Sequence, residues 1–307
     1  EPITMDLNIQ MAFGKGPKAA SSSHTYKYWV AVARRDIAPI VSTDWLQENL
    51  SNARLVVIDV RKVEEYKAGH IPGAVNVFYG TWAIKKGSLL NELPATDDLM
   101  DAVGNAGIGS DSLVVVVGKM DAPTDRVDLT RVAWTLKYAG LENVSLLDGG
   151  QNKWVKEGKT LSTDAPKVKA KPFKGKLNRN LFVNKDYVKS SLGKAMLVDV
   201  REPDFYAGKK KLPFVNRMGH LPGAVNLPTS YAYNPDGTFK TVPELSAMIR
   251  INIGDDKGKE IITYCDTGKF CTAWSFLMSE LFGYTNVKVY DGSSQDWLND
   301  PSLPAEM

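Results

Sequence analysis

The sequence contains few residues of the kinds that build metal sites or disulfide frameworks. Its 307 residues include two cysteines, Cys265 and Cys271, and three histidines. Two cysteines cannot form a disulfide framework, and their spacing relative to the scattered histidines matches no zinc motif. We therefore expect no metal site and no other cofactor.

Further absences narrow the class of protein. The formal net charge is only +3, which gives no argument for a nucleic-acid partner. No run of about 18 apolar residues is present that could span a membrane. The first residue is Glu1 rather than Met, as after removal of a signal peptide or in a truncated chain. We expect a periplasmic or otherwise exported protein, with the cytoplasm as the alternative.

The second half of the chain repeats the first. Residues 55–61 (LVVIDVR) are echoed by 195–201 (AMLVDVR), and 69–76 (GHIPGAVN) returns as 219–226 (GHLPGAVN). An apolar segment at 113–117 has its counterpart at 260–264, and an Asp-Gly pair closed by a tryptophan occurs at 148–154 and 291–297. Matched segments in the same order indicate tandem homologous domains.

Each copy alternates short apolar strands with helical stretches, including opening helices at 43–50 and 184–192 with Ser42 and Asn184 as caps. This alternation predicts an α/β fold, with two doubly wound domains and mainly parallel sheets. We place the domains at 37–158 and 181–307. They are joined by a basic surface linker at 159–180 and preceded by an extension at 1–36, in which 28–32 is either a strand or an anchor.

A reactive cysteine is predicted where a strand of the second copy ends. The apolar segment 261–264 stops at Cys265, a loop containing Gly268 follows, and Thr272 is the expected helix N-cap. A thiol at the positive end of a helix dipole, beside unpaired N–H groups, is favoured as the reactive thiolate. The alternative is a buried cysteine that serves as a small hydrophobic residue.

Together these motifs resemble the two-domain form of the rhodanese (thiosulfate sulfurtransferase) family over residues 37–300. The resemblance implies an inactive first domain, and the first copy indeed has Gly118 where the second has Cys265. It also implies that the Cys265 thiolate takes a sulfur atom from thiosulfate or a related donor such as 3-mercaptopyruvate. The resulting persulfide would pass its outer sulfur to cyanide or a thiol. Partners would thus be a small anionic donor and a thiol or cyanide acceptor; a monomer is favoured, and the oligomeric state stays open.

The resemblance also suggests which groups would hold the persulfide and the donor. The persulfide loop would be formed by Asp266, Thr267, Gly268, Lys269, Phe270 and Cys271. Lys269 is the best single cation for the donor, and further anion contacts are expected from Arg201, Lys209 and Arg217. The interval from Asp199 to His220 is ten residues longer than its counterpart in the first copy. This insertion, with Lys209, Lys210, Lys211 and Arg217, is either a lip over the anion site or an ordinary surface loop.

Other residues of the repeat have structural interpretations. The pairs Asp59–Arg61 and Asp199–Arg201 should tie strand ends to neighbouring loops. His70 and His220 occur in both copies although only one has the thiol, so we expect them to stabilise turns. The expected core tryptophans are Trp154, Trp274 and Trp297.

Several positions depart from the family pattern. Thiosulfate-using members commonly have a basic residue soon after the cysteine, where this chain has Asp266 and Thr267. Phe205 replaces a substrate-contacting arginine, Phe270 ends the loop, and the neutral loop of mercaptopyruvate-using members is not matched. Two alternatives therefore stay open: a sulfur carrier without turnover, and a Cys265–Cys271 redox switch. A dual-specificity phosphatase of the same fold is disfavoured, because no arginine follows Cys265 before Phe282.

Overall fold

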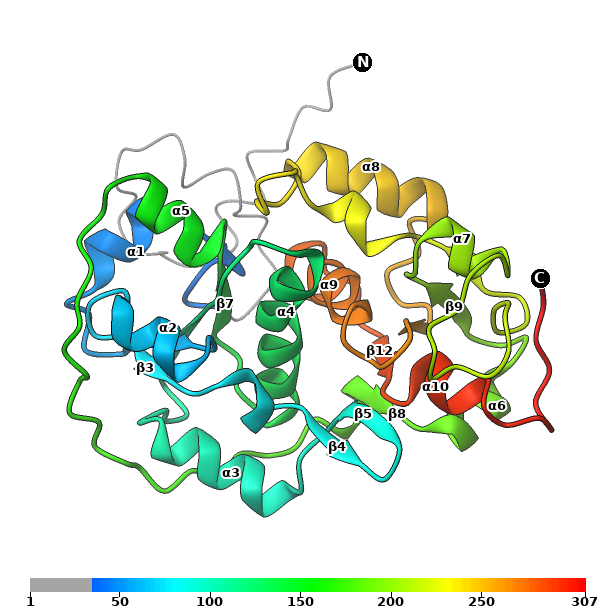
Figure 1. Cartoon of the computed structure of the whole chain (residues 1–307), viewed down its shortest axis with the longest axis horizontal. Helices are drawn as coiled ribbons and strands as arrows, with labels where there is room; N and C mark the ends of the chain where they lie inside the picture. Colours follow the sequence, from blue (N-terminus) through cyan, green and yellow to red (C-terminus); the bar gives the residue numbers. More distant parts are fainter. Residues whose placement is uncertain (1–34) are drawn as a thin grey trace.

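The computed structural model describes residues 35–307, which form two lobes placed side by side (Figure 1). The segment 28–32, expected to be a strand or an anchor, lies outside the described residues. The two lobes correspond to the two copies of the sequence repeat. None of the helices in the described part of the chain is long and apolar enough to cross a membrane.

The first domain is built on a parallel sheet with strand order β1-β7-β6-β2-β3. Its strands are β1 (Ile40–Val41), β2 (Leu55–Asp59), β3 (Val75–Asn76), β6 (Leu113–Val117) and β7 (Val144–Leu147). Its helices are α1 (Thr43–Asn49), α2 (Val63–Ala68), α3 (Thr96–Asn105), α4 (Pro123–Tyr138) and α5 (Gly150–Lys156). A 3-10 turn, η3 (Tyr79–Thr81), precedes an antiparallel hairpin of β4 (Ile84–Lys86) and β5 (Leu89–Glu92).

The second domain repeats this plan, with strand order β10-β9-β11-β12-β8. Its strands are β8 (Phe182–Val183), β9 (Met196–Asp199), β10 (Val225–Asn226), β11 (Ile261–Tyr264) and β12 (Val287–Tyr290), paired in parallel. Its helices are α6 (Lys185–Ser191), α7 (Pro203–Tyr206), α8 (Val242–Asn252), α9 (Cys271–Phe276) and α10 (Ser293–Trp297). Its short helical turns are η4 (Arg179–Leu181), η5 (Thr229–Ala232) and the π-helical η6 (Leu277–Leu281).

Both sheets are covered on both faces, which confirms the doubly wound α/β prediction. Along β6, Val114 and Val116 belong to one core cluster, whereas Val115 and Val117 belong to the cluster on the opposite face. Successive side chains of a strand point to opposite faces, so a strand buried on both faces is apolar throughout. The predicted caps are also confirmed: Ser42 Oγ accepts the Trp45 N–H, and Asn184 Oδ1 accepts the Tyr187 N–H, each at 3.0 Å.

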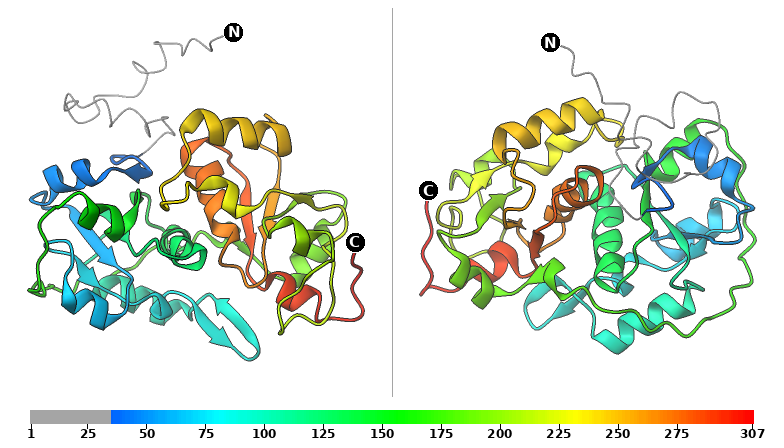
Figure 2. Two further views of the ribbon diagram at one scale, coloured as in Figure 1. Left: turned by 45° about the horizontal axis from the view of Figure 1, so that its top comes forward. Right: turned by 180° about the vertical axis from the view of Figure 1, so that it is seen from behind.

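The domains share a core. Helices α4 and α9 lie next to each other at the centre of the molecule in all views (Figures 1 and 2). The largest core cluster contains fully buried side chains from both domains, such as Trp134 of α4 and Leu277 of η6. The β4–β5 hairpin extends from the first domain toward α10 of the second (Figure 1). The carboxyl ends of the strands in both domains therefore meet near one interface.

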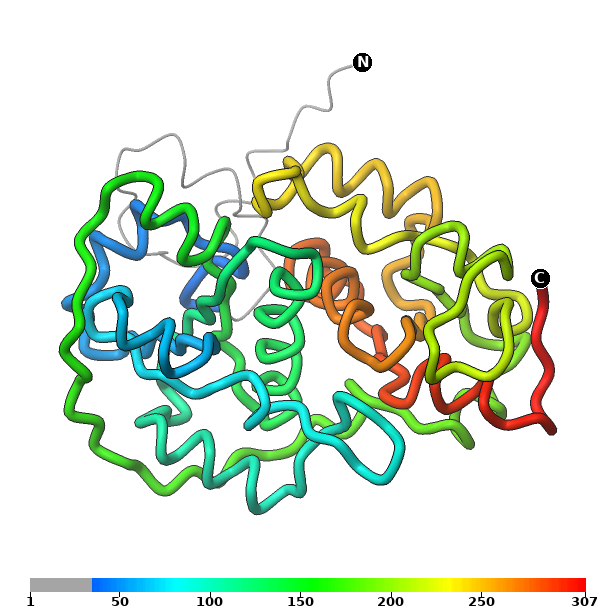
Figure 3. The backbone as a smooth tube through the Cα atoms, in the orientation of Figure 1, coloured from blue at the N-terminus to red at the C-terminus, as the bar shows by residue number. Residues whose placement is uncertain are grey.

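The connection between the domains runs along the outside of the first domain (Figure 3). Residues 159–180 are mostly exposed, as expected of a surface linker. Backbone hydrogen bonds fasten it at intervals, including Lys171 N–H to Gly104 O at 2.9 Å and Asn178 N–H to Tyr138 O at 2.8 Å. The linker thus lies against the first domain along a defined path.

Candidate active site

Cys265 follows β11 directly and is held there by the segment that begins α10. Its backbone N–H donates to Ser293 Oγ at 3.1 Å, and its carbonyl accepts the Ser294 N–H at 3.0 Å. Gly268 turns the loop with φ +75°, and a Cβ at this position would lie 2.3 Å from the Asp291 carbonyl oxygen. Only glycine fits such a turn without displacing backbone. The predicted order of strand, cysteine, loop and helix is confirmed.

The expected N-cap at Thr272 is wrong. Helix α9 begins at Cys271, and Phe270 occupies the cap position without a side-chain hydrogen bond. Thr272 lies inside the first turn, where its hydroxyl donates to the Lys269 carbonyl at 2.7 Å and lies 2.9 Å from Thr130 Oγ1 of α4. The contact with the first domain explains this difference, because it fixes the Thr272 side chain inside the helix.

The environment of Cys265 favours the thiolate. The residue is 2% exposed, and this burial alone would raise the pKa of its thiol. Hydrogen bonds from the Cys271 side chain and from the backbone N–H groups of Cys271, Thr267 and Lys269 outweigh burial and lower the pKa to about 6. The loop amides therefore surround the sulfur atom with donors, the arrangement needed to stabilise a negative charge there.

A second thiol, that of Cys271, lies beside the Cys265 sulfur. Its Sγ lies 3.7 Å from Cys265 Sγ, and the residue is fully buried at the start of α9. Burial, together with the adjacent Cys265, raises the pKa of the Cys271 thiol well above its usual value. The two shifts favour the thiolate on Cys265 and the thiol on Cys271, which can then donate a hydrogen bond to it.

Asp266 places a carboxyl group beside the thiol. Burial raises its pKa to about 7, with the negative charges of Cys265 and Asp199 acting in the same direction and Arg201 opposing them. Arg201 Nη1 lies 3.7 Å from Asp266 Oδ1, but the guanidinium is committed to Asp199 at 2.6 Å and to the Gly219 carbonyl at 2.8 Å. Of the three predicted anion contacts, Arg201 is the one that this structure brings to the loop.

Lys269 points to the first domain. Its Nζ lies 2.5 Å from Asp128 Oδ1 and 3.0 Å from Thr124 Oγ1, both on α4, and 4.4 Å from the centroid of the Tyr79 ring. The side chain is 12% exposed. The charge predicted to meet the donor is therefore paired with a carboxylate across the domain interface.

The insertion was interpreted as either a lip over the anion site or an ordinary surface loop, and the contacts of its arginine favour the second interpretation. Arg217 donates instead to carbonyl groups of the C-terminal segment, those of Leu298 at 3.0 Å, Leu303 at 2.9 Å and Asp300 at 2.7 Å. Lys209 is exposed. We therefore correct the assignment of Arg217, which anchors the end of the chain, whereas the anion contact of Lys209 stays a prediction.

The first domain contributes a buried cation that the sequence analysis missed. Arg131 of α4 is fully buried; its Nη1 donates to the Gly268 carbonyl at 2.8 Å and to Asp291 Oδ1 at 2.6 Å. Its guanidinium carbon lies 4.7 Å from the centroid of the Phe182 ring. An arginine at the centre of a stretch, 127–136, in which six of the ten residues are apolar was the available signal. It supports the underside of the loop from the other domain.

The β4–β5 hairpin, also missed, closes over the same loop. Asn91 Nδ2 donates to Thr267 Oγ1 at 2.9 Å, and the Tyr79 hydroxyl donates to Asn91 Oδ1 at 2.8 Å. Leu90 N–H donates to Gln295 Oε1 at 3.0 Å, and Leu93 N–H to Asp291 Oδ2 at 2.9 Å. The first domain thus forms part of the site although it has no thiol.

In the first domain the position equivalent to Cys265 is Gly118, and a side chain there would overlap with neighbouring core side chains. A Cβ at Gly118 would lie 2.6 Å from Leu129 Cδ1 and 3.2 Å from Val60 Cγ2. The asymmetry between the copies is therefore also a difference in packing. In the first domain, core side chains fill the space that a thiol would need.

The structural interpretations of the repeated pairs are confirmed. Arg61 joins Asp59 to the Gly69 carbonyl, as Arg201 does for Asp199 and Gly219. His70 and His220 stack on tyrosine rings 3.8 and 3.9 Å away and contact backbone carbonyls rather than the loop. The three tryptophans expected in the core, Trp154, Trp274 and Trp297, are fully buried.

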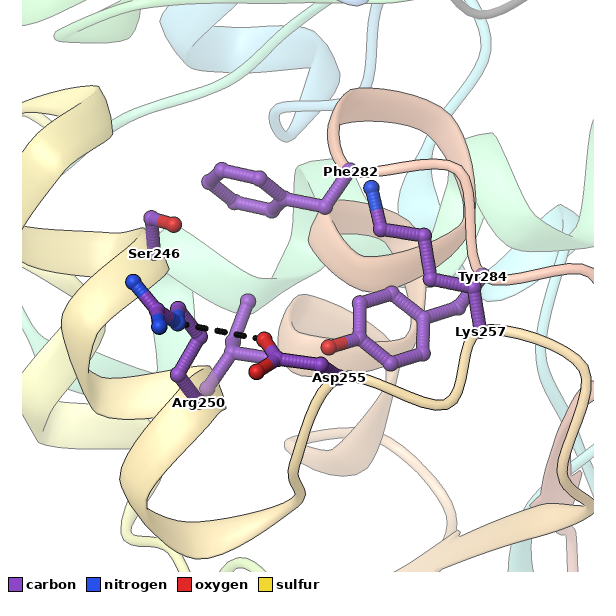
Figure 4. Close-up of a pocket in the computed structure, with 7 residues that line it drawn as sticks. Ser246, Arg250, Asp255, Lys257, Phe282 and Tyr284 are labelled. Atoms are coloured by element: carbon purple, nitrogen blue, oxygen red, sulfur yellow. Dashed lines mark hydrogen bonds and ion pairs between the residues drawn. The ribbon is translucent and has the colours of Figure 1, made fainter. Parts of the chain in front are cut away.

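A separate hollow of about 260 Å³ lies on the second domain beside α8 (Figure 4). Its polar lining includes Arg250 and Asp255, which pair with each other at 3.1 Å, and Lys257. None of its lining residues belongs to the Cys265 loop. Among residues 35–307 no cluster of three or more histidine, cysteine or acidic side chains could hold a metal ion.

Comparison with known proteins agrees with this geometry. The model of the rhodanese-like domain matches the chain twice, at residues 42–157 and 184–300. The chain belongs to the rhodanese family. Both matches fall within the domains predicted at 37–158 and 181–307.

Relatives of similar length are found among bacterial proteins. The sulfur carrier protein TtuD of Thermus thermophilus is 33% identical over 280 residues, which cover 86% of this chain and 95% of that protein. A protein of Saccharopolyspora erythraea named "Putative thiosulfate sulfurtransferase" is also 33% identical, over 87% of this chain and 95% of its own. The assignment to sulfurtransferase-type rhodaneses therefore rests on nearly whole-chain matches.

Solved structures show the same fold. A structure of EanB, described with a cysteine persulfide and ergothioneine, superposes with a TM-score of 0.78 at 24% identity. The match covers 88% of this rhodanese and 70% of that chain. At this identity the likeness concerns the fold alone.

Proposed function

We propose that this rhodanese is a sulfurtransferase that carries sulfur on Cys265 as a persulfide. The observation that carries the proposal is the thiol at the end of β11, with a pKa of about 6 and three loop N–H groups directed at its sulfur. Such a cysteine is largely ionised at neutral pH, and the thiolate is the nucleophilic form. The sulfur donors expected from the family are thiosulfate and 3-mercaptopyruvate.

The reaction would proceed in two displacements. The Cys265 thiolate attacks the outer sulfur of the donor, the new S–S bond forms, and the bond from that sulfur to the rest of the donor breaks. With thiosulfate the leaving group is sulfite. In the second step an acceptor thiolate or cyanide attacks the outer sulfur of the persulfide, and Cys265 leaves again as a thiolate. The N–H groups of Thr267, Lys269 and Cys271 would stabilise the anionic sulfur in both states.

A sulfur carrier is the second candidate, favoured by the relative that bears this name. A carrier would form the same Cys265 persulfide and give up its sulfur once to a specific partner. The two functions share the first step and differ in the second. Multiple turnover with a small acceptor therefore separates them.

The test is an intact mass spectrum before and after incubation with a sulfane-sulfur donor, followed by addition of cyanide. We expect a gain of one sulfur atom on the Cys265 peptide, its removal by cyanide, and thiocyanate formed in many cycles. Cys265→Ser should abolish the gain, whereas Cys271→Ser should keep at least part of the transfer. A gain without repeated thiocyanate formation would support the carrier, and undiminished transfer by Cys265→Ser would exclude both functions.

A further inference from the structure

The cations at the persulfide loop are all neutralised by carboxylates. Within the described part of the chain, three cationic side chains contact residues 265–271 or belong to them: Lys269, Arg131 and Arg201. Lys269 pairs with Asp128 at 2.5 Å, Arg131 with Asp291 at 2.6 Å, and Arg201 with Asp199 at 2.6 Å. Each pair is largely or fully buried, so solvent screens these interactions little.

A fourth carboxyl group stands beside the thiol without a strong partner. Within residues 35–307, Asp266 Oδ1 is buried and accepts no hydrogen bond, and its nearest cation, Arg201 Nη1, is 3.7 Å away. The loop region therefore holds four carboxyl groups against three cations. Above the raised pKa of Asp266, about 7, its charge is uncompensated, and the Cys265 thiolate adds a further negative charge. A donor that brings two negative charges would find no free cation at the loop within residues 35–307 and would meet like charges at close range.

The geometry points to a hydropersulfide of a small thiol, R–S–SH, as the preferred sulfur donor of this site, ahead of the thiosulfate dianion. The inference rests on the proposed function. In the reaction the Cys265 thiolate attacks the outer sulfur, forming Cys265–S–SH, and the bond between the two donor sulfurs breaks. The thiolate R–S⁻ leaves with the electron pair. The hydrogen on the transferred sulfur remains with it, so no oxidant or reductant is needed.

Asp266 is the specificity-determining residue in this account. Asp266 follows the nucleophile directly, and its neighbouring cation, Arg201, is already paired with Asp199. Removing its charge should favour the dianion more than a donor with at most one charge at the reacting end. Asp128 gives an independent variant on the other domain, because its loss would free the Lys269 ammonium.

The experiment measures the first displacement alone. Protein is mixed with cysteine hydropersulfide or with thiosulfate, quenched with an alkylating agent at set times, and the sulfur gain on the Cys265 peptide is read by mass spectrometry. For the wild type we expect a second-order rate at least about 100-fold higher with the hydropersulfide. Asp266→Asn should raise the thiosulfate rate about tenfold or more relative to the hydropersulfide rate of the same variant.

Two further variants complete the test. Asp128→Asn should also raise the thiosulfate rate, and it keeps the inference testable if Asp266→Asn does not fold. Asp255→Asn is the matched control, since Asp255 is exposed and lies beside α8, away from the loop. Thiosulfate loading as fast as hydropersulfide loading, or equal rates in all variants, would overturn the inference and leave the proposed function intact. No loading from either donor would instead remove the proposed function.

Discussion

At the scale of single residues, the reactivity of Cys265 depends on the second cysteine as a proton donor. The two sulfurs lie 3.7 Å apart, and Cys271 has its pKa raised while that of Cys265 is lowered. A thiol with a raised pKa is a weak nucleophile, which argues against Cys271 as an attacking group. As a donor it stabilises the neighbouring thiolate, which gives the second cysteine of the loop a part in the proposed sulfur transfer.

We therefore predict a shift in the pH dependence of Cys265 alkylation when the donor is removed. In the wild type the rate should rise with pH through about 6 and then level off, because the thiolate is the reacting form. In Cys271→Ala the midpoint should move to higher pH, since loss of a donor to the charged form raises a pKa. The rate of iodoacetamide labelling, followed by peptide mass spectrometry, gives both curves.

Cys271→Ser is the matched control for this prediction. A serine hydroxyl keeps a donor at the same position, so its midpoint should stay closer to that of the wild type. An unchanged midpoint in Cys271→Ala would show that the backbone amides alone set the pKa.

The residues whose positions in the site could be predicted from the sequence are those whose contacts lie within one short segment of the chain. Cys265 and Gly268 were predictable because a strand end, a turn and a helix start all lie within a dozen residues. The role of Lys269 was not, because its partner Asp128 is on the other domain. The same holds for Arg131, whose contacts with Gly268 and Asp291 exist only after the domains have packed.

At the scale of elements, the β4–β5 hairpin gives the first domain a part in the site. It reaches the loop through one side chain, Asn91, which links the Tyr79 hydroxyl to Thr267. Asn91 has a φ of +57°, a conformation that asparagine tolerates better than most residues. The backbone is thus turned so that the amide can bridge two segments far apart in the chain.

Asn91→Gly should separate this bridge from the backbone conformation that supports it. Glycine keeps the positive φ but loses both side-chain hydrogen bonds, each contributing about 0.5–1.5 kcal/mol. We expect sulfur loading of Cys265 to slow about three- to tenfold and the melting temperature to fall slightly, because two hydrogen bonds are lost. Asn91→Ala should slow loading similarly and lower the melting temperature further, because alanine is strained at this φ. Wild-type loading in both variants would mean that the hairpin covers the loop without ordering it.

The elements themselves followed from sequence periodicity, whereas their contacts across the interface did not. The parallel strands were predictable as apolar runs between helices, and the repeat fixed their order in each domain. The hairpin at 84–92 has no counterpart in the repeat and carries no motif. Its bond to Thr267 joins residues 176 positions apart, a contact that depends on how two finished domains dock.

At the scale of the whole molecule, each domain accepts a hydrogen bond from the backbone of the other through the same repeated motif. Asp291, from the Asp-Gly motif of the second copy, accepts the Leu93 N–H of the first domain at 2.9 Å. Asp148, from the same motif of the first copy, accepts the Phe239 N–H of the second domain at 2.9 Å. The repeated motif therefore serves the interface in both directions. Together with the shared core, this predicts that both domains unfold in one transition.

The contribution of the domain interface to the stability of the molecule can be tested at Arg131. It is a fully buried cation of the first domain, paired with Asp291 of the second, and its Nε and Nη2 have no hydrogen-bond partner within residues 35–307. Removing one member of a buried ion pair leaves the other charge uncompensated, which typically lowers the free energy of unfolding by about 3–5 kcal/mol. We expect a loss of this size in Arg131→Met, measured by chemical denaturation.

Two variants decide whether the lost stability comes from the buried pair. Arg126→Met removes a half-buried arginine of the same helix that also crosses the interface, through an exposed hydrogen bond to the Pro235 carbonyl at 2.7 Å. Its loss should lower the free energy of unfolding by less than about 1 kcal/mol. Adding Asp291→Asn to Arg131→Met should recover part of the stability, because the stranded carboxylate is then neutral. Equal losses in Arg126→Met and Arg131→Met, or no recovery in the double variant, would mean that packing rather than charge pairing joins the two domains at the Cys265 loop.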